Sequence, residues 1–303
     1  MSQTMLQLVN QVQSELNLAV STSVAGNPNQ DVQQILALMN GSGYDLLKEY
    51  DWQALQVQYR FYTQAITTNA TTVNGSTTLT VPSGLDISGV TSQWQVTGYN
   101  INQDTNVVSA NNTTKQIVMS QMANGSGTGS VVLAQTAYSL PDDFETITDR
   151  THWDKTKHWE MLGPEDAQQW QWLKSGYIST GPRIRWRILD NQFQIWPPMN
   201  TNEYLGWEYR SKGWARSATG TVQNSFIADT DTTVLDDRIM VLATKLKYFQ
   251  IKSFDTTALT ADYNRYLSVA KANDKGAPNL SFAPYPSKVL IGYANIPDTG
   301  YGS

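Results

Sequence analysis

Three arginines at alternate positions form the sharpest chemical pattern in this chain. Arg183, Arg185 and Arg187 alternate with apolar residues, so a β-strand would hold all three guanidinium groups on one face. Such a row could contact DNA phosphates along a channel or an acidic protein surface. The interpretation we favour is structural: a solvated row that pairs across the sheet with Glu203 or Glu208.

Two histidines, His152 and His158, are the only ones in the chain. Their spacing does not place two imidazoles on one helical face, and no other ligand cluster accompanies them, so we expect no metal site. Cysteine is absent, which excludes disulfides, thiolate nucleophiles and zinc ribbons. The chain also lacks the G-x-S-x-G, H-E-x-x-H and Walker motifs. We therefore expect neither an enzyme nor a bound cofactor.

Eight of the ten tryptophans lie between residues 153 and 214. Exposed indole rings stack on sugars, but tryptophan is also enriched at protein–protein contacts. Trp186, Trp196 and Trp207 occupy predicted strands, where we expect them to be part of the core. Sugar binding through the remaining rings is the alternative function that the residues leave open.

The composition is polar but poorly charged. Charged residues make up 16% of the chain, against about 25% in an average soluble domain. The net charge of −5 argues against a protein that grips nucleic acid by its phosphates. No apolar run reaches the ~20 residues that span a bilayer, and the first residues lack the pattern of a signal peptide. We expect a soluble protein, made inside the cell, with no membrane partner.

Apolar residues at helical spacing predict two helices within the first 50 residues. Asn27 is the predicted N-cap of the second helix, with Pro28 at its first position. Gly41 and Gly43 interrupt the pattern, which indicates a bend or the close approach of another backbone. A short helix is predicted from residue 164, and two longer ones follow between residues 236 and 275.

Alternating residues predict strands at 57–61, 183–189, 193–196 and 204–210. Between residues 63 and 135 the composition shifts, because only Asp86, Asp104 and Lys115 are charged there. Turn signals divide this stretch into five short β-type runs, at 77–81, 94–96, 106–108, 116–119 and 130–133. We interpret residues 63–135 as an all-β module inserted into another fold.

Residues 276–303 contain four prolines and four glycines and show no helical period. They are nevertheless too apolar for a free linker. We predict an extended C-terminal arm that lies on another chain. Its anchors would be Leu280, Phe282, Tyr285, Leu290 and Tyr293.

Together these elements predict an α+β fold: a helical bundle core with a small antiparallel sheet, an inserted all-β module and an extended arm. The predicted core comprises residues 1–62 and 136–275. The module comprises residues 63–135 and the arm residues 276–303.

Several short motifs follow one another in a distinctive order. YDLLKEYDWQAL occupies residues 44–55, YSLPDDF residues 138–144, and FQIWPP residues 193–198. LDDR at 235–238 and DYNRY at 262–266 complete the series. In this order the motifs resemble the head-to-tail adaptor family of short-tailed bacteriophages, across the whole predicted core. The module at 63–135 resembles small β modules of phage tail proteins.

The resemblance implies a structural role without a reaction. Such adaptors form a twelve-fold ring, a dodecamer, directly beneath the portal protein, whose lower face their helices contact. The predicted arm would then lie on the portal or on a neighbouring adaptor. The rest of the ring receives the tail nozzle or tube protein and the tail fibres, and DNA passes through its bore without specific binding. The protein would be part of the virion neck and would assemble in the bacterial cytoplasm. The alternative is a sugar-binding tail or fibre component that uses exposed tryptophans.

Overall fold

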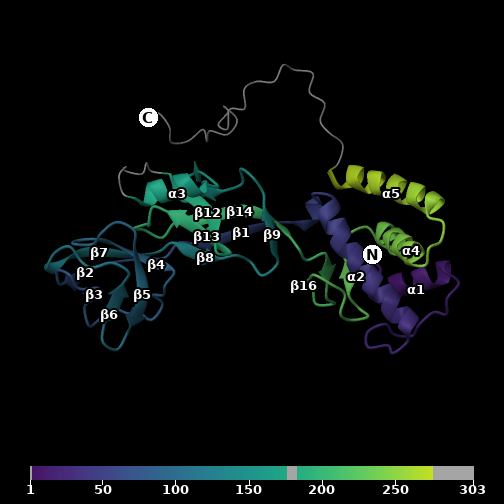
Figure 1. The fold of residues 1–303 in the computed structure, drawn as a ribbon, viewed down its shortest axis with the longest axis horizontal. Helices are drawn as coiled ribbons and strands as arrows, with labels where there is room; N and C mark the ends of the chain where they lie inside the picture. The colour runs from purple at the N-terminus through teal and green to yellow at the C-terminus, as the bar shows by residue number, and fades with distance from the viewer. Residues whose placement is uncertain (1, 176–182, 276–303) are drawn as a thin grey trace, which may run out of the picture.

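The computed structural model describes residues 2–175 and 183–275. The chain forms an elongated molecule with helices at one end, small antiparallel sheets in the middle and a closed β-barrel at the other end (Figure 1). The mixed α+β class predicted from the sequence is therefore confirmed. None of the helices described is long and apolar enough to cross a membrane.

Four helices pack together at one end of the molecule (Figure 1). They are α1 (Met5–Glu15), α2 (Gln30–Glu49), α4 (Asp237–Ile251) and α5 (Thr257–Lys275). α4 contacts each of the other three helices, and one apolar core joins them through buried residues such as Leu8, Ile35 and Met240. A short 3-10 helix, η1 (Gln53–Leu55), leads from α2 towards the sheets.

The start of α2 differs from the sequence prediction. Asn29, not Asn27, caps the helix, and its side chain accepts a hydrogen bond from the backbone N–H of Asp31 at 2.9 Å. The Asn27 side chain instead accepts from the Asn29 backbone N–H at 2.9 Å and donates to the Ser23 carbonyl at 2.7 Å. Asn27 thus shapes the turn before the helix, and Pro28 lies in that turn.

α2 runs without interruption through its two glycines. At Gly43 the close neighbour is a side chain and not a backbone, because a Cβ built there would lie 2.4 Å from the indole of Trp214. Trp214 is fully buried in the core of the bundle. A glycine at position 43 therefore lets this ring pack directly against the helix backbone.

The middle of the molecule contains two sheets that share a core. The five-stranded sheet contains β1 (Gln56–Tyr62), β14 (Tyr204–Ser211), β10 (Trp153–Asp154), β11 (Trp159–Glu160) and β9 (Phe144–Ile147). The three-stranded sheet contains β12 (Arg185–Leu189), β13 (Gln192–Trp196) and β8 (Ala137–Ser139). Trp186, Phe193 and Trp207 stack between them.

Other small elements complete this region. Asp190 and Asn191 have φ angles of 51° and 55°, as expected for the tight turn predicted between β12 and β13. Helix α3 (Ala167–Lys174) is capped by Asp166. A third sheet beside the helices contains β15 (Ala215–Arg216), β16 (Val222–Gln223) and β17 (Thr232–Thr233).

Six strands close into a barrel in the order β2-β3-β6-β5-β4-β7. They are β2 (Ala65–Thr72), β3 (Thr78–Thr80), β4 (Trp94–Gly98), β5 (Thr105–Asn111), β6 (Gln116–Met119) and β7 (Gly127–Gln135). Within the barrel, β2 is the strand that the sequence patterns missed, because its residues are mostly Thr, Ala and Asn. It forms a strand because all eight of its residues pair with β7.

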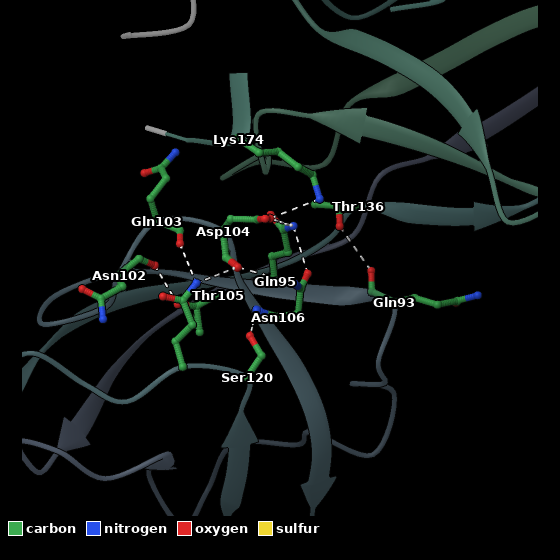
Figure 2. Close-up of polar contacts among 11 residues, drawn as sticks. Gln93, Gln95, Asn102, Gln103, Asp104, Thr105, Asn106, Ser120, Thr136 and Lys174 are labelled. Atoms are coloured by element: carbon green, nitrogen blue, oxygen red, sulfur yellow. Dashed lines mark hydrogen bonds and ion pairs between the residues drawn. The ribbon is translucent and has the colours of Figure 1, made fainter. Parts of the chain in front are cut away.

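A polar joint, hereafter the Asp104–Lys174 joint, ties the barrel to α3 (Figure 2). The ammonium group of Lys174 lies 3.1 Å from Oδ1 of Asp104. The buried Gln95 amide also donates to Oδ1 of Asp104, at 2.9 Å, and so fixes that carboxylate. Lys174 also lies over the rings of Trp170 and Trp196, so the joint contacts two buried aromatic side chains.

Hydrogen bonds fix the two chain segments that connect the barrel to the sheets. The backbone N–H of Thr63 donates to the Glu203 carbonyl at 2.9 Å, and the N–H of Glu203 donates to the Thr63 hydroxyl at 2.7 Å. The N–H of Gln135 donates to the Gln64 carbonyl at 2.9 Å. The barrel is thus attached to the sheets by paired chain segments and the Asp104–Lys174 joint together.

Candidate binding surface

The three arginines of the predicted row differ in their surroundings. Arg183 is exposed and precedes β12, so the strand begins two residues later than predicted. Arg185 forms an ion pair with the buried carboxylate of Glu165 at 2.5 Å. Arg187 lies opposite Gln194 in the β12–β13 register. Only one of the three therefore has an ion-pair partner in the part of the chain that the structure describes.

The predicted pairing of this row with Glu203 or Glu208 is wrong. Both glutamates flank or lie on β14, which belongs to the five-stranded sheet, whereas β12 belongs to the three-stranded one. Glu203 is buried and pairs with Lys157 at 2.9 Å. Burial raises the pKa of Glu203, but hydrogen bonds, chiefly from Thr201 and Lys157, outweigh it and hold the pKa below its usual value.

The structure describes the tryptophans singled out in the sequence, but not the predicted arm anchors. Trp186, Trp196 and Trp207 are buried in the core, as predicted. Trp159 and Trp172 are 39% and 46% exposed. The five predicted anchors of the arm lie outside the described residues: Leu280, Phe282, Tyr285, Leu290 and Tyr293.

The two histidines occupy very different environments. His152 is buried, and its imidazole stacks on Trp186 with ring centroids 3.9 Å apart. Burial lowers the pKa of His152 to about 4, so the ring is neutral near pH 7. His158 is exposed on a turn with a φ of 58°. Within residues 2–175 and 183–275, no cluster of three or more His, Asp or Glu side chains could hold a metal ion.

An open depression lies on the outer face of the five-stranded sheet. We call it the Trp153 depression. Its lining residues are Gln58, Arg150, Thr151, Trp153, Asp154, Lys155, His158 and Glu208. They come from β1, β10, β14 and the turns that flank β10.

Strand register explains how Lys155 can lie across this face. Gly206 on β14 lies opposite Arg60 on β1 and opposite Trp153 on β10, so these positions share the outer face. A Cβ at Gly206 would come within 2.8 Å of the Lys155 side chain. The absence of a side chain at Gly206 therefore leaves room for Lys155 to lie across the sheet.

The charged side chains that line the depression differ in whether they have partners. Within the described residues, the side chains of Arg150, Lys155 and Glu208 make no hydrogen bond or ion pair. By contrast, the buried carboxylate of Asp154 accepts bonds from the backbone N–H groups of Thr156 and Lys157, at 2.9 and 3.1 Å. Asp154 thus builds the turn, whereas both cations and the carboxylate of Glu208 stay available to a ligand.

Sequence reasoning did not find this surface. It kept Trp153 among the tryptophans that could stack on a sugar and expected no metal site at the two histidines, but Gln58 and Glu208 are distant from Trp153 in the chain. Only the strand pairing of β1, β14 and β10 brings them together. No protein-family model matches the chain, and no curated protein is significantly similar to it.

Proposed function

We propose that this protein is a structural virion component: a head-to-tail adaptor that joins the portal to the tail of a short-tailed bacteriophage. The observation that carries the proposal is the separation of a helical bundle and a closed β-barrel at opposite ends of one elongated chain (Figure 1). Such a chain can hold two different partners apart. The order of the sequence motifs supports the same role.

The helical end suits contact with the portal. Ile251 and Phe254, at the turn between α4 and α5, are each 57% exposed, and Val269 on α5 is also exposed. Apolar side chains gathered at one end of a molecule are typical of protein interfaces. We assign this end to the portal.

The barrel suits contact with tail proteins, as the inserted module of the adaptor. Only Asp86, Asp104 and Lys115 are charged within residues 63–135. Tyr99 and Met122 are exposed on the barrel. Because charged residues are depleted at the centre of protein interfaces, we assign the barrel to the nozzle, tube or fibre proteins.

The ring itself is inferred from the family resemblance. At a net charge of −5 for each chain, twelve copies would carry −60. A ring with this charge would repel DNA overall and limit its sticking to the bore. The contacts between copies would be heterologous and would close into a cycle.

Electron microscopy of the protein mixed with its portal tests the proposal directly. We expect a closed ring of twelve copies on one face of the portal, with the barrels pointing away from it. Native mass spectrometry with and without the portal provides an independent count. A protein that stays monomeric in both conditions would contradict the adaptor role.

Saccharide binding by a tail component is the second candidate function. The observation that favours it is the Trp153 depression, where an indole ring lies beside Arg150, Lys155 and Glu208, whose side chains have no hydrogen bond or ion pair within the described residues. Rings with adjacent hydrogen-bonding groups are what a sugar requires. This candidate and the adaptor role do not exclude each other, because they use different surfaces.

A further inference from the structure

We propose that the Trp153 depression binds an acidic saccharide, a glycan with a carboxylate on at least one sugar ring. The inference rests on saccharide binding, the second candidate function, and does not depend on the adaptor role. Three observations support it: two tyrosines on the same face of the sheet as Trp153, cations that have no partner among the described residues, and hydrogen-bonding groups suited to hydroxyls.

The aromatic surfaces follow from the register of three strands. Tyr62 lies opposite Tyr204, and the next pair along the same face is Arg60 with Gly206, which in turn lies opposite Trp153. The rings of Tyr62 and Tyr204 stack with centroids 4.7 Å apart. Residues two apart on one strand are separated by about 7 Å, so an oligosaccharide of a few units can contact both the tyrosines and Trp153.

The cations provide a place for a carboxylate. Arg150 and Lys155 both line the depression, and neither has a hydrogen-bond or ion-pair partner among the described residues. A guanidinium group binds a carboxylate through two parallel hydrogen bonds, which gives both strength and geometry. We therefore assign the carboxylate of the sugar to Arg150, with Lys155 as the second positive charge.

Glu208 and Gln58 distinguish a sugar from other anions. Glu208 lies opposite Gln58 in the register, and its carboxylate is available to accept hydrogen bonds from hydroxyl groups. The Gln58 side-chain oxygen already accepts a bond from Nε of Arg60 at 2.8 Å, which leaves the Gln58 NH₂ group to donate. A negative charge beside the two cations disfavours a polyanion that has no hydroxyls to offer Glu208.

Calorimetric titration of the full-length protein with three probes tests this assignment. The probes are tetragalacturonate, the neutral sugar maltotetraose, and tetraglutamate, which has carboxylates but no sugar ring. We expect tetragalacturonate to bind at least tenfold more tightly than either of the others. Equal binding of tetraglutamate would overturn the proposal in favour of an acidic peptide site.

Variants then locate the site. Arg150→Gln and Trp153→Ala should each weaken tetragalacturonate binding about tenfold or more. The matched controls are Arg183→Gln and Trp172→Ala, which change an exposed arginine and an exposed tryptophan outside the depression and should leave the affinity unchanged. Arg150 is exposed, so its variant should fold normally, which circular dichroism checks.

The outcomes distinguish saccharide binding in general from a preference for acidic sugars. If maltotetraose binds as well as tetragalacturonate and Trp153→Ala abolishes both, saccharide binding holds and the preference for acidic sugars is wrong. If neither sugar binds, both are wrong, whatever the portal experiment shows. If Arg183→Gln weakens binding as much as Arg150→Gln, the site is not in the Trp153 depression.

Discussion

At the scale of single residues, Gly43 shows how one missing side chain sets a helix packing. Alanine normally stabilises a helix by about 1 kcal/mol relative to glycine. At position 43, however, its Cβ would lie 2.4 Å from the buried ring of Trp214, and overpacking of this kind costs about 1–3 kcal/mol. We therefore expect Gly43→Ala to lower the free energy of unfolding by up to about 2 kcal/mol in urea titrations.

Gly41 provides the matched control in the same helix. The nearest atom to a Cβ at Gly41 is the flexible Nζ of Lys247, at 3.1 Å. Gly41→Ala should thus leave the free energy of unfolding unchanged or raise it. Equal destabilisation by both substitutions would show that the helix, and not the Trp214 contact, requires glycine.

His152 should make stability depend on pH. Its pKa is lowered by burial to about 4 in the folded protein, against about 6.5 in an unfolded chain. Between these values the unfolded state binds more protons, so stability present above pH 6.5 is lost as the pH falls towards 4. The loss should reach at most about 3 kcal/mol.

Thermal unfolding between pH 4 and pH 7 measures this effect. His152→Phe, which keeps an aromatic ring beside Trp186, should flatten the dependence in that range. His158→Asn, which replaces the exposed histidine, is the matched control. An unchanged pH dependence in His152→Phe would rule out His152 as its source.

The three arginines of the row should contribute differently to stability, because only Arg185 has an ion-pair partner within the described residues. Arg185→Gln leaves the buried carboxylate of Glu165 without its cation, and we expect a loss of about 1–2 kcal/mol of stability. Arg183→Gln and Arg187→Gln should have little effect on the melting temperature. If all three substitutions left stability intact but virions lost DNA, the alternative interpretation, a row that faces the bore, would hold.

At the scale of elements, the barrel is attached through neighbouring strands. Ala65 on β2 and Ala134 on β7 are register partners, so a two-residue Asn-Gly turn can join them after removal of residues 66–133. Thr63, Gln64 and Gln135 stay in place with their backbone bonds to the rest of the chain. We expect the helices and central sheets to fold and portal binding to persist, while tail proteins no longer attach.

Circular dichroism, melting temperature and portal pull-down measure the three parts of this prediction. The deletion also removes the Asp104–Lys174 joint, so Lys174→Ala in the full chain serves as the control for that loss. A shortened chain that fails to fold would show that the barrel belongs to the core and that the predicted boundaries at 63 and 135 are wrong.

At the scale of the whole molecule, the two ends should be separable by mutation. Ile251→Ser with Phe254→Ser changes exposed side chains at the helical end, so the fold should persist while the affinity for the portal falls at least tenfold. Val73→Ser with Met122→Ser changes exposed side chains of the barrel and should spare the portal. Binding assays with portal rings measure both effects. Loss of portal binding in the barrel variant would show that the barrel, and not the helical end, binds the portal.

Local patterns in the sequence determined most of the elements of this protein. Helical spacing and alternation depend on neighbours within a few residues, so the four long helices and strands β12, β13 and β14 could be predicted. β2 could not, because its Thr and Ala residues have no apolar alternation and become a strand only through β7. The partner of Arg185 was missed because Glu165 lies in the segment before α3 and not on a strand that pairs with β12.

The Trp153 depression was decided by the tertiary structure alone. Gln58, Trp153 and Glu208 lie far apart in the chain and meet because β14 pairs with both β1 and β10. The space that Lys155 occupies depends on Gly206, which looks like an ordinary strand glycine until its neighbours are known. Residue type is a local property that a sequence displays, whereas strand pairing joins distant segments, so only the folded chain shows which charges share a surface.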